Sequence, residues 1–111
     1  MEFFCDLEQQ ASTRRLPFLV IGGFAVNFYG YSRDTADLDL LICRKSVAAW
    51  RELFSQFGYS VDRDAEAFIQ LAPPSDGEWP VDLMLVGEPT FAPMWADGRE
   101  VTILGARLKI T

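Results

Sequence analysis

Two carboxylates one position apart, Asp37 and Asp39, are the residues of this chain best placed for chemistry. They open the apolar run 37–43, which is typical of a strand, and a strand places residues i and i+2 on one face, roughly 6.6 Å apart. Two anions held side by side repel each other unless a cation lies between them. Carboxylate oxygens suit Mg²⁺, which takes few protein ligands and leaves room for substrate phosphates. The spacing therefore predicts a magnesium site.

A doubled glycine, Gly22-Gly23, lies between a short apolar run at 18–21 and a helical pattern at 24–31. A glycine turn at a helix start offers free N–H groups to a phosphate. Together with the acid pair it predicts a site for a divalent cation and a polyphosphate, as nucleotidyl transfer requires. A plain tight turn is the structural alternative for the glycines, and the solvent face of an edge strand is the alternative for the acids.

A third carboxylate, Asp82, lies inside the apolar run 81–86. A carboxylate in such a strand costs free energy unless it has a partner. Asp82 could therefore also be a structural residue that forms a salt bridge, for example with Arg33. If this strand neighbours the strand of Asp37 and Asp39, three carboxylates converge at one edge of the sheet. Two metal ions about 4 Å apart can then activate the attacking oxygen and steady the leaving one. The third carboxylate can also accept the proton of the attacking hydroxyl.

At this point the chain resembles a known family, the nucleotidyltransferase superfamily related to DNA polymerase beta, in its small prokaryotic and toxin–antitoxin branches. The resemblance covers residues 18–43 and resumes at 81–86, and the helix predicted at 47–57 lies where the family has one. The motif that carries it reads Gly22-Gly23, a helix, then Arg33-x-Thr35-x-Asp37-Leu-Asp39, with Asp82 on the later strand.

The resemblance implies an activity and its participants. The glycine turn would hold the triphosphate of a nucleotide, taken to be ATP, and the three aspartates would hold two Mg²⁺ ions. A nucleoside monophosphate would pass to an acceptor hydroxyl, with release of pyrophosphate. Arg33 and Thr35 join the nucleotide site, although Arg33 could instead pair with Asp34, and Thr35 could shape the loop. The acceptor would be a protein, a small molecule or an RNA end.

Two departures from the family pattern bear on activity. Many members have Gly-Ser where this chain has Gly22-Gly23, so a hydroxyl for phosphate is missing. Longer members continue into helices after a segment like 106–111, so we expect one nucleotidyltransferase-like domain over residues 1–111 without that helical part. The alternative function is a non-catalytic nucleotide-binding, antitoxin or assembly module of the same fold. A phosphoacceptor receiver domain is a weaker alternative, because such domains carry acids on their first strand and the strand predicted here at 18–21 has none.

The remaining pattern predicts an α/β or α+β fold, with a mixed central sheet and helices packed on one face. Ser46 and Gly58 are predicted to cap the helix at 47–57. The segment 89–96 reads as a short helix or a loop, and 73–77 as a turn. We expect helices at 2–14, 24–31 and 47–57, and strands at 18–21, 37–43, 59–62, 68–72, 81–86, 100–104 and 107–110.

Composition excludes several classes of chemistry. The chain has 111 residues, a net charge of −6 and no histidine, so catalysis by Ser-His-Asp or Cys-His and His-ligated zinc are ruled out. The acidic balance disfavours general affinity for nucleic acid. Cys5 and Cys43 are expected to be reduced thiols. The chain lacks the pattern of a signal peptide or a membrane span, so we expect a cytoplasmic protein, with a partner protein or a homodimer paired through 100–110.

Two further groups of residues are candidates of lower weight. The acids at 62, 64 and 66 have alternating spacing that suggests a metal site, but a solvated turn is the favoured interpretation. Trp50, Phe54 and Phe57 are predicted to form a core stripe. Trp79 and Trp95 lie in loop-like contexts, where each could stack on a base, contact a partner or pack.

Overall fold

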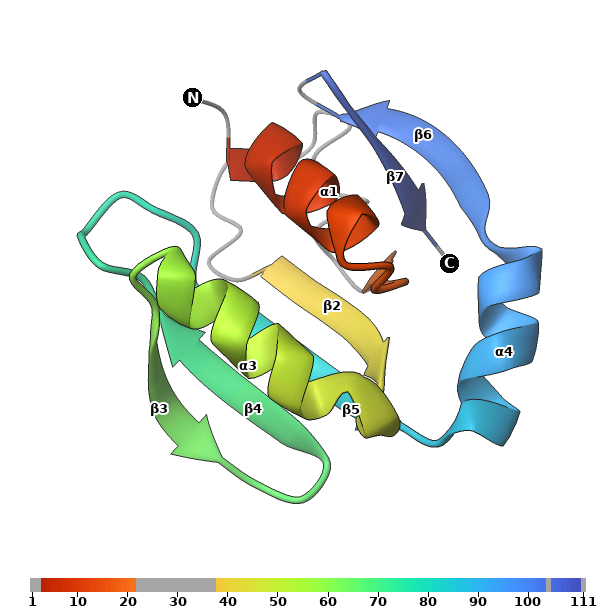
Figure 1. Ribbon diagram of the computed structural model, residues 1–111, viewed down its shortest axis with the longest axis horizontal. Coiled ribbons are helices and arrows are strands. Elements are labelled where there is room, and N and C mark those ends of the chain that lie inside the picture. Colours follow the sequence, from red (N-terminus) through yellow and green to blue (C-terminus); the bar gives the residue numbers. More distant parts are fainter. Residues whose placement is uncertain (1–2, 22–37, 104, 111) are drawn as a thin grey trace.

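The computed structural model describes residues 3–21, 38–103 and 105–110, and this part of the chain forms one seven-stranded sheet (Figure 1). The strand order is β3-β4-β5-β2-β1-β7-β6. The helices are α1 (Phe3–Thr13), α3 (Val47–Gln56) and α4 (Glu88–Asp97), with a 3₁₀ turn, η2 (Arg44–Ser46), before α3. The strands are β1 (Leu19–Ile21), β2 (Leu38–Cys43), β3 (Ser60–Asp64), β4 (Phe68–Ala72), β5 (Val81–Val86), β6 (Arg99–Ile103) and β7 (Ala106–Ile110).

The sheet is mixed, as predicted. Strand β2 runs parallel to β5 and β1 runs parallel to β7, whereas the other neighbouring strands are antiparallel. Helices and strands alternate along the chain only in part, so the fold class is α+β.

Helices α1 and α3 lie side by side on one face of the sheet (Figure 1). Each buries an apolar stripe at helical spacing, and the even-numbered residues of β2 face them. Helix α4 packs on the opposite face, where Phe91 meets Leu41 and Cys43 of β2. The residues that the two helices and β2 bury in the first core are Phe4, Leu7, Ala11, Leu38, Leu40, Ile42, Trp50, Leu53 and Phe54.

The predicted caps of α3 lie where expected, although only one works as predicted. Gly58 follows the helix with φ of +91°, the left-handed conformation that glycine adopts most readily. Ser46 precedes the helix, but its hydroxyl makes no capping hydrogen bond, because the 3₁₀ turn η2 leads directly into α3.

The segment with two interpretations, 89–96, is a helix. Pro89 stands in the first turn of α4, where a missing N–H costs little. Pro93 lies inside the helix, and Phe91 is the residue of the helix that is buried. The prediction of a helix at 24–31 lies outside the described residues. No helix in the part of the chain that the structure describes is long and apolar enough to span a membrane.

Candidate functional site

Asp39 and Asp82 lie directly opposite each other on the neighbouring parallel strands β2 and β5. The register is fixed at the strand starts, where the Leu38 N–H donates to the carbonyl oxygen of Pro80 at 2.8 Å. Adjacent strands are about 4.8 Å apart, and residues in register point to the same face. The condition on which the sequence argument depended, that these two strands are neighbours, is therefore met, and two of the three predicted carboxylates are brought together.

The acid pair lies on the face opposite to α1 and α3. Leu38 and Leu40 alternate with Asp39 and are fully buried, whereas Asp39 itself is half-buried. Asp82 is half-buried between Val81 and Leu83 in the same way. Helix α4 packs on this face at Leu41 and Cys43, toward the carboxyl end of β2, whereas the two acids lie near the amino ends of their strands.

The chemistry of the pair suits a divalent cation. Two carboxylates held in register offer up to four hard oxygens to one ion, the ligand type that Mg²⁺ takes. No group of three or more potential metal ligands is found among the described residues. The third predicted ligand, Asp37, lies outside them, so Asp39 and Asp82 are the part of the predicted site that can be placed.

The other predicted site residues, Gly22, Gly23, Arg33 and Thr35, also lie outside the described residues. Ile21, the residue before Gly22, is in register with Asp39 across β1 and β2. The last described residue before the doubled glycine therefore lies beside the first of the placed carboxylates.

The second acidic cluster is solvent-exposed, as predicted, but Asp62 and Asp64 lie in strand β3 and not in the predicted turn. Asp62, Asp64 and Glu66 are all exposed, and Asp64 pairs with Arg51 of α3 at 2.9 Å. The strand predicted at 59–62 extends to Asp64, with a bulge between Val61 and Arg63.

The aromatic residues mostly serve packing. Trp50 and Phe54 are fully buried, which confirms the predicted core stripe. Trp79 is half-buried, with its ring 5.7 Å from that of Phe4. Trp95 is half-buried, stacked on Phe91 at 6.1 Å, and the Lys109 ammonium lies 3.9 Å from its ring centroid.

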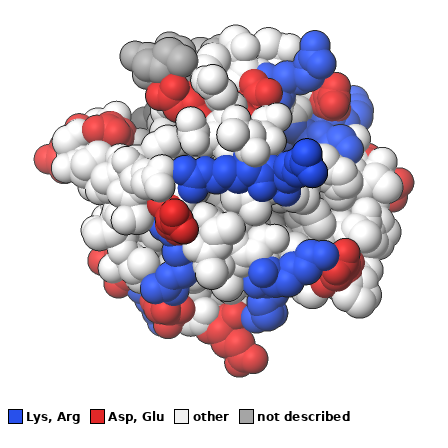
Figure 2. Space-filling view, in the orientation of Figure 1, with Lys and Arg blue, Asp and Glu red and all other residues white. Residues whose placement is uncertain are grey.

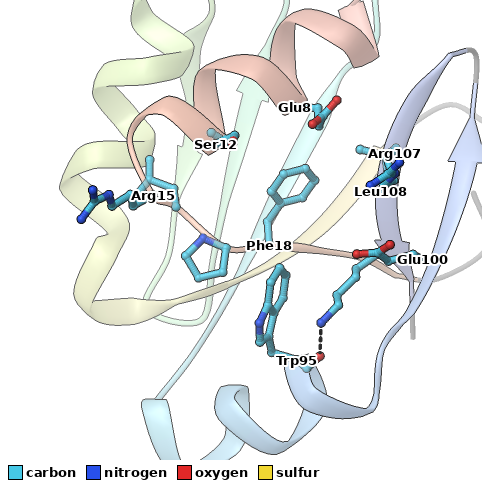
Figure 3. A pocket seen from close by; sticks show the side chains of 12 residues that line it. Glu8, Ser12, Arg15, Phe18, Trp95, Glu100, Arg107 and Leu108 are labelled. Atoms are coloured by element: carbon cyan, nitrogen blue, oxygen red, sulfur yellow. Dashed lines mark hydrogen bonds between the residues drawn. The ribbon is translucent and has the colours of Figure 1, made fainter.

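A separate pocket of about 430 Å³ lies between the end of α1, α4 and β7 (Figure 3). Phe18 and Trp95 line it, and Lys109 donates to the Trp95 carbonyl oxygen at 2.8 Å across its mouth. Phe18 precedes β1, whereas Asp39 pairs with Ile21 at the other end of that strand, so the pocket is distinct from the acid pair. Sequence reasoning missed it because its walls come from four separate segments.

Charges on the face that carries α1 and α3 are interspersed (Figure 2). Lys and Arg side chains alternate there with Asp and Glu rather than gathering over one element. This arrangement agrees with the net charge of −6 in disfavouring a general nucleic-acid surface on that face.

Comparison with known proteins finds similarity at the level of structure. No family model matches the chain, and no curated protein matches it. A crystal structure of ANT(2'')-Ia in complex with adenylyl-2''-tobramycin superposes with a TM-score of 0.69 at 18% identity, covering 93% of this chain and 63% of that one. The Thermotoga maritima protein TM1012 gives 0.66 at 16% identity, covering 94% and 71%. A nucleotidyltransferase-like protein from Paracoccidioides brasiliensis gives 0.59 at 16% identity, covering 94% and 56%.

These likenesses define the class of fold. The described part of the chain is an α+β domain built on a mixed sheet. Its fold is similar to the folds of these three solved structures, two of which are described as a putative nucleotidyltransferase and a nucleotidyltransferase-like protein. The chain spans less than two thirds of the length of ANT(2'')-Ia.

Proposed function

We propose that this protein is a Mg²⁺-dependent nucleotidyltransferase that moves a nucleoside monophosphate from ATP to an acceptor hydroxyl and releases pyrophosphate. The observation that carries the proposal is the register of Asp39 with Asp82 on parallel neighbouring strands. The likeness to the nucleotidyltransferase fold supports the same reaction type. Metal binding would use Asp39, Asp82 and Asp37, the last of which directly precedes β2.

Each residue has a proposed role. Asp37 and Asp39 would bind Mg²⁺, and Gly22 and Gly23 would present backbone N–H groups to the β and γ phosphates of ATP. When bound, Mg²⁺ would neutralise phosphate charge and stabilise the leaving pyrophosphate.

Asp82 would accept the proton of the attacking hydroxyl, because it lies beside Asp39 on the same face of the sheet. Arg33 and Thr35 would contact the triphosphate. Most of the rate gain then comes from positioning the two reactants and from neutralising charge.

Several finer features belong to the proposal as well. The acceptor is a protein, a small molecule or an RNA end. A toxin–antitoxin role, a partner protein or homodimer, and a cytoplasmic location follow from the sequence-based interpretation and stay predictions.

The test is transfer of labelled nucleotide. The protein is incubated with Mg²⁺ and α-labelled ATP, and a panel of hydroxyl compounds, proteins and RNA is supplied as acceptors. We expect transfer that is lost in the D37N/D39N double variant and in D82N, and kept in D62N, which removes an exposed acid of β3. Transfer that persists in the double variant would eliminate the assignment.

The alternative, a non-catalytic module of the same fold, predicts a different result. Calorimetry would then show binding of ATP with Mg²⁺, while no pyrophosphate would be released with any acceptor. Absence of both binding and release would exclude the two functions together.

A further inference from the structure

The register that pairs the two acids continues across the sheet. Gln70 of β4 lies opposite Asp82, and Arg63 of β3 lies opposite Gln70. Asp39, Asp82, Gln70 and Arg63 therefore form one row on one face, which we call the polar row. At about 4.8 Å between strands, the backbone of Arg63 is about 10 Å from that of Asp82.

Gln70 is the nearest member of the polar row to Asp82 on the side away from Asp39. Its side chain is half-buried, and its carboxamide makes no hydrogen bond to any of the described residues. A carboxamide offers two N–H donors and one carbonyl acceptor. It can therefore hold a neutral polar group, such as a hydroxyl, beside the proposed base.

Arg63 ends the polar row at the outer strand of the sheet. Its guanidinium lies 5.6 Å from the centroid of the Phe68 ring and forms no ion pair with the described residues. The next acid along β3, Asp64, is bonded to Arg51 of α3, on the opposite face. The planar fork of an arginine matches a phosphate or a carboxylate, so this guanidinium is available to a bound anion.

We propose that the polar row from Asp82 to Arg63 is the acceptor subsite, and that it takes a hydroxyl compound bearing an anionic group. The hydroxyl lies at Asp82, a neutral polar part of the acceptor contacts Gln70, and a phosphate or carboxylate contacts Arg63. The apolar ring of Phe68 flanks the bound molecule. The inference rests on the proposed nucleotidyl transfer for its chemistry, but its binding contacts can be tested alone.

The first test is acceptor preference. Glucose, glucosamine and glucose 6-phosphate present similar hydroxyls with a neutral, cationic or anionic group. With Mg²⁺ and ATP, we expect kcat/KM for glucose 6-phosphate to exceed that for glucose about tenfold or more, since hydrogen bonds to charged groups are worth about 1.5–3 kcal/mol. R63Q should abolish this preference, and Q70A should raise KM for all three sugars. R99Q, on the edge strand β6 at the other end of the sheet, is the matched control and should keep the preference.

The second test needs no turnover. Side-chain N–H signals of arginine and glutamine are followed by NMR while glucose 6-phosphate is added in the presence of Mg²⁺. We expect saturable shifts at Arg63 and Gln70, and none at Arg99.

The two tests separate the inference from the proposed function. Binding at Arg63 and Gln70 without transfer to any acceptor would refute the proposed function and keep the subsite. Transfer that is indifferent to R63Q and Q70A would keep the function and overturn the subsite. Absence of shifts at Arg63, or equal shifts at Arg99, would overturn it as well.

Discussion

Asp39 and Asp82 occupy register-matched positions on two parallel strands that touch at the centre of the sheet. Forty-two residues separate them in the sequence, and the strand pairing alone brings them together. Like charges opposite each other on neighbouring strands repel, so this arrangement is unfavourable unless a cation or another group offsets the repulsion. Like charges kept in register on neighbouring strands are typical of a functional site.

This relationship predicts a stability that depends on Mg²⁺ and on both acids. Mg²⁺ at ten times its Kd should stabilise the wild-type protein by about 1.4 kcal/mol and raise Tm by about 5 °C. D39N and D82N should each lose most of that increase, because one carboxylate holds the ion poorly. Thermal unfolding followed by circular dichroism, with and without Mg²⁺, measures the effect.

The control for this prediction is D62N, which removes an exposed acid of β3 and leaves the pair intact. It should respond to Mg²⁺ as the wild type does. An equal Mg²⁺-dependent shift in D39N and in the wild type would contradict the assignment of Asp39 to a cation site.

Local pattern was sufficient to predict much of the fold. The apolar run 37–43 predicted a strand, and β2 spans Leu38–Cys43, with Asp39 and Leu40 on opposite faces because a strand has a period of two. Gly58 was identified as the end of α3, because few other residues adopt a positive φ there. Both features depend on residues close together in the sequence.

What the sequence could not provide is register across strands. The polar row depends on the pairing of Gln70 with Asp82 and of Arg63 with Gln70, and the second pairing follows a bulge after Val61. A slip of one residue would send these side chains to the other face. Such pairings are set by contacts between distant segments, which no local pattern records.

Two glycines with nearly the same φ allow a comparison of backbone strain with packing. Gly58 has φ of +91° and Gly77 has +92°. A Cβ at Gly58 would lie 3.2 Å from the Cβ of Pro74, whereas a Cβ at Gly77 would meet nothing within 4 Å. We expect G77A to cost about 1 kcal/mol for the left-handed backbone, and G58A about 2 kcal/mol because Pro74 must also shift. Urea denaturation measures both, and a G58A cost no larger than that of G77A would refute the packing contribution.

The core under α3 depends on Trp50. Its side chain is fully buried, 5.4 Å from the ring of Phe18 and 6.1 Å from that of Phe54, and its Nε1 has no hydrogen-bond partner in the described part of the chain. W50A should lower the free energy of unfolding by about 3–5 kcal/mol. W50F should cost clearly less, because it keeps an aromatic ring and removes a donor that is buried without a partner.

The control for the Trp50 prediction is W95F, which replaces a half-buried ring stacked on Phe91 with a smaller one and should cost less than about 1 kcal/mol. Chemical denaturation gives all three values. A W50F variant as unstable as W50A would mean that the indole N–H, rather than the ring, holds this part of the core.

Tyr59 predicts how stability falls in alkali. Its hydroxyl donates to the Trp79 carbonyl oxygen at 2.6 Å, and burial, with a smaller contribution from Glu78, raises its pKa from 10.0 to about 12. The folded protein thus holds this proton more tightly than the unfolded chain does. The stabilisation is complete below about pH 10 and is lost as the pH rises through about 12. Y59F should lose about 1 kcal/mol at neutral pH with the hydrogen bond, and its stability should fall less steeply between these pH values. The free energy of unfolding of both proteins is measured by urea denaturation from pH 8 to pH 12. The difference between the two proteins isolates Tyr59, since all other groups are the same in both. Parallel curves of stability against pH would show that the fold does not hold the Tyr59 proton.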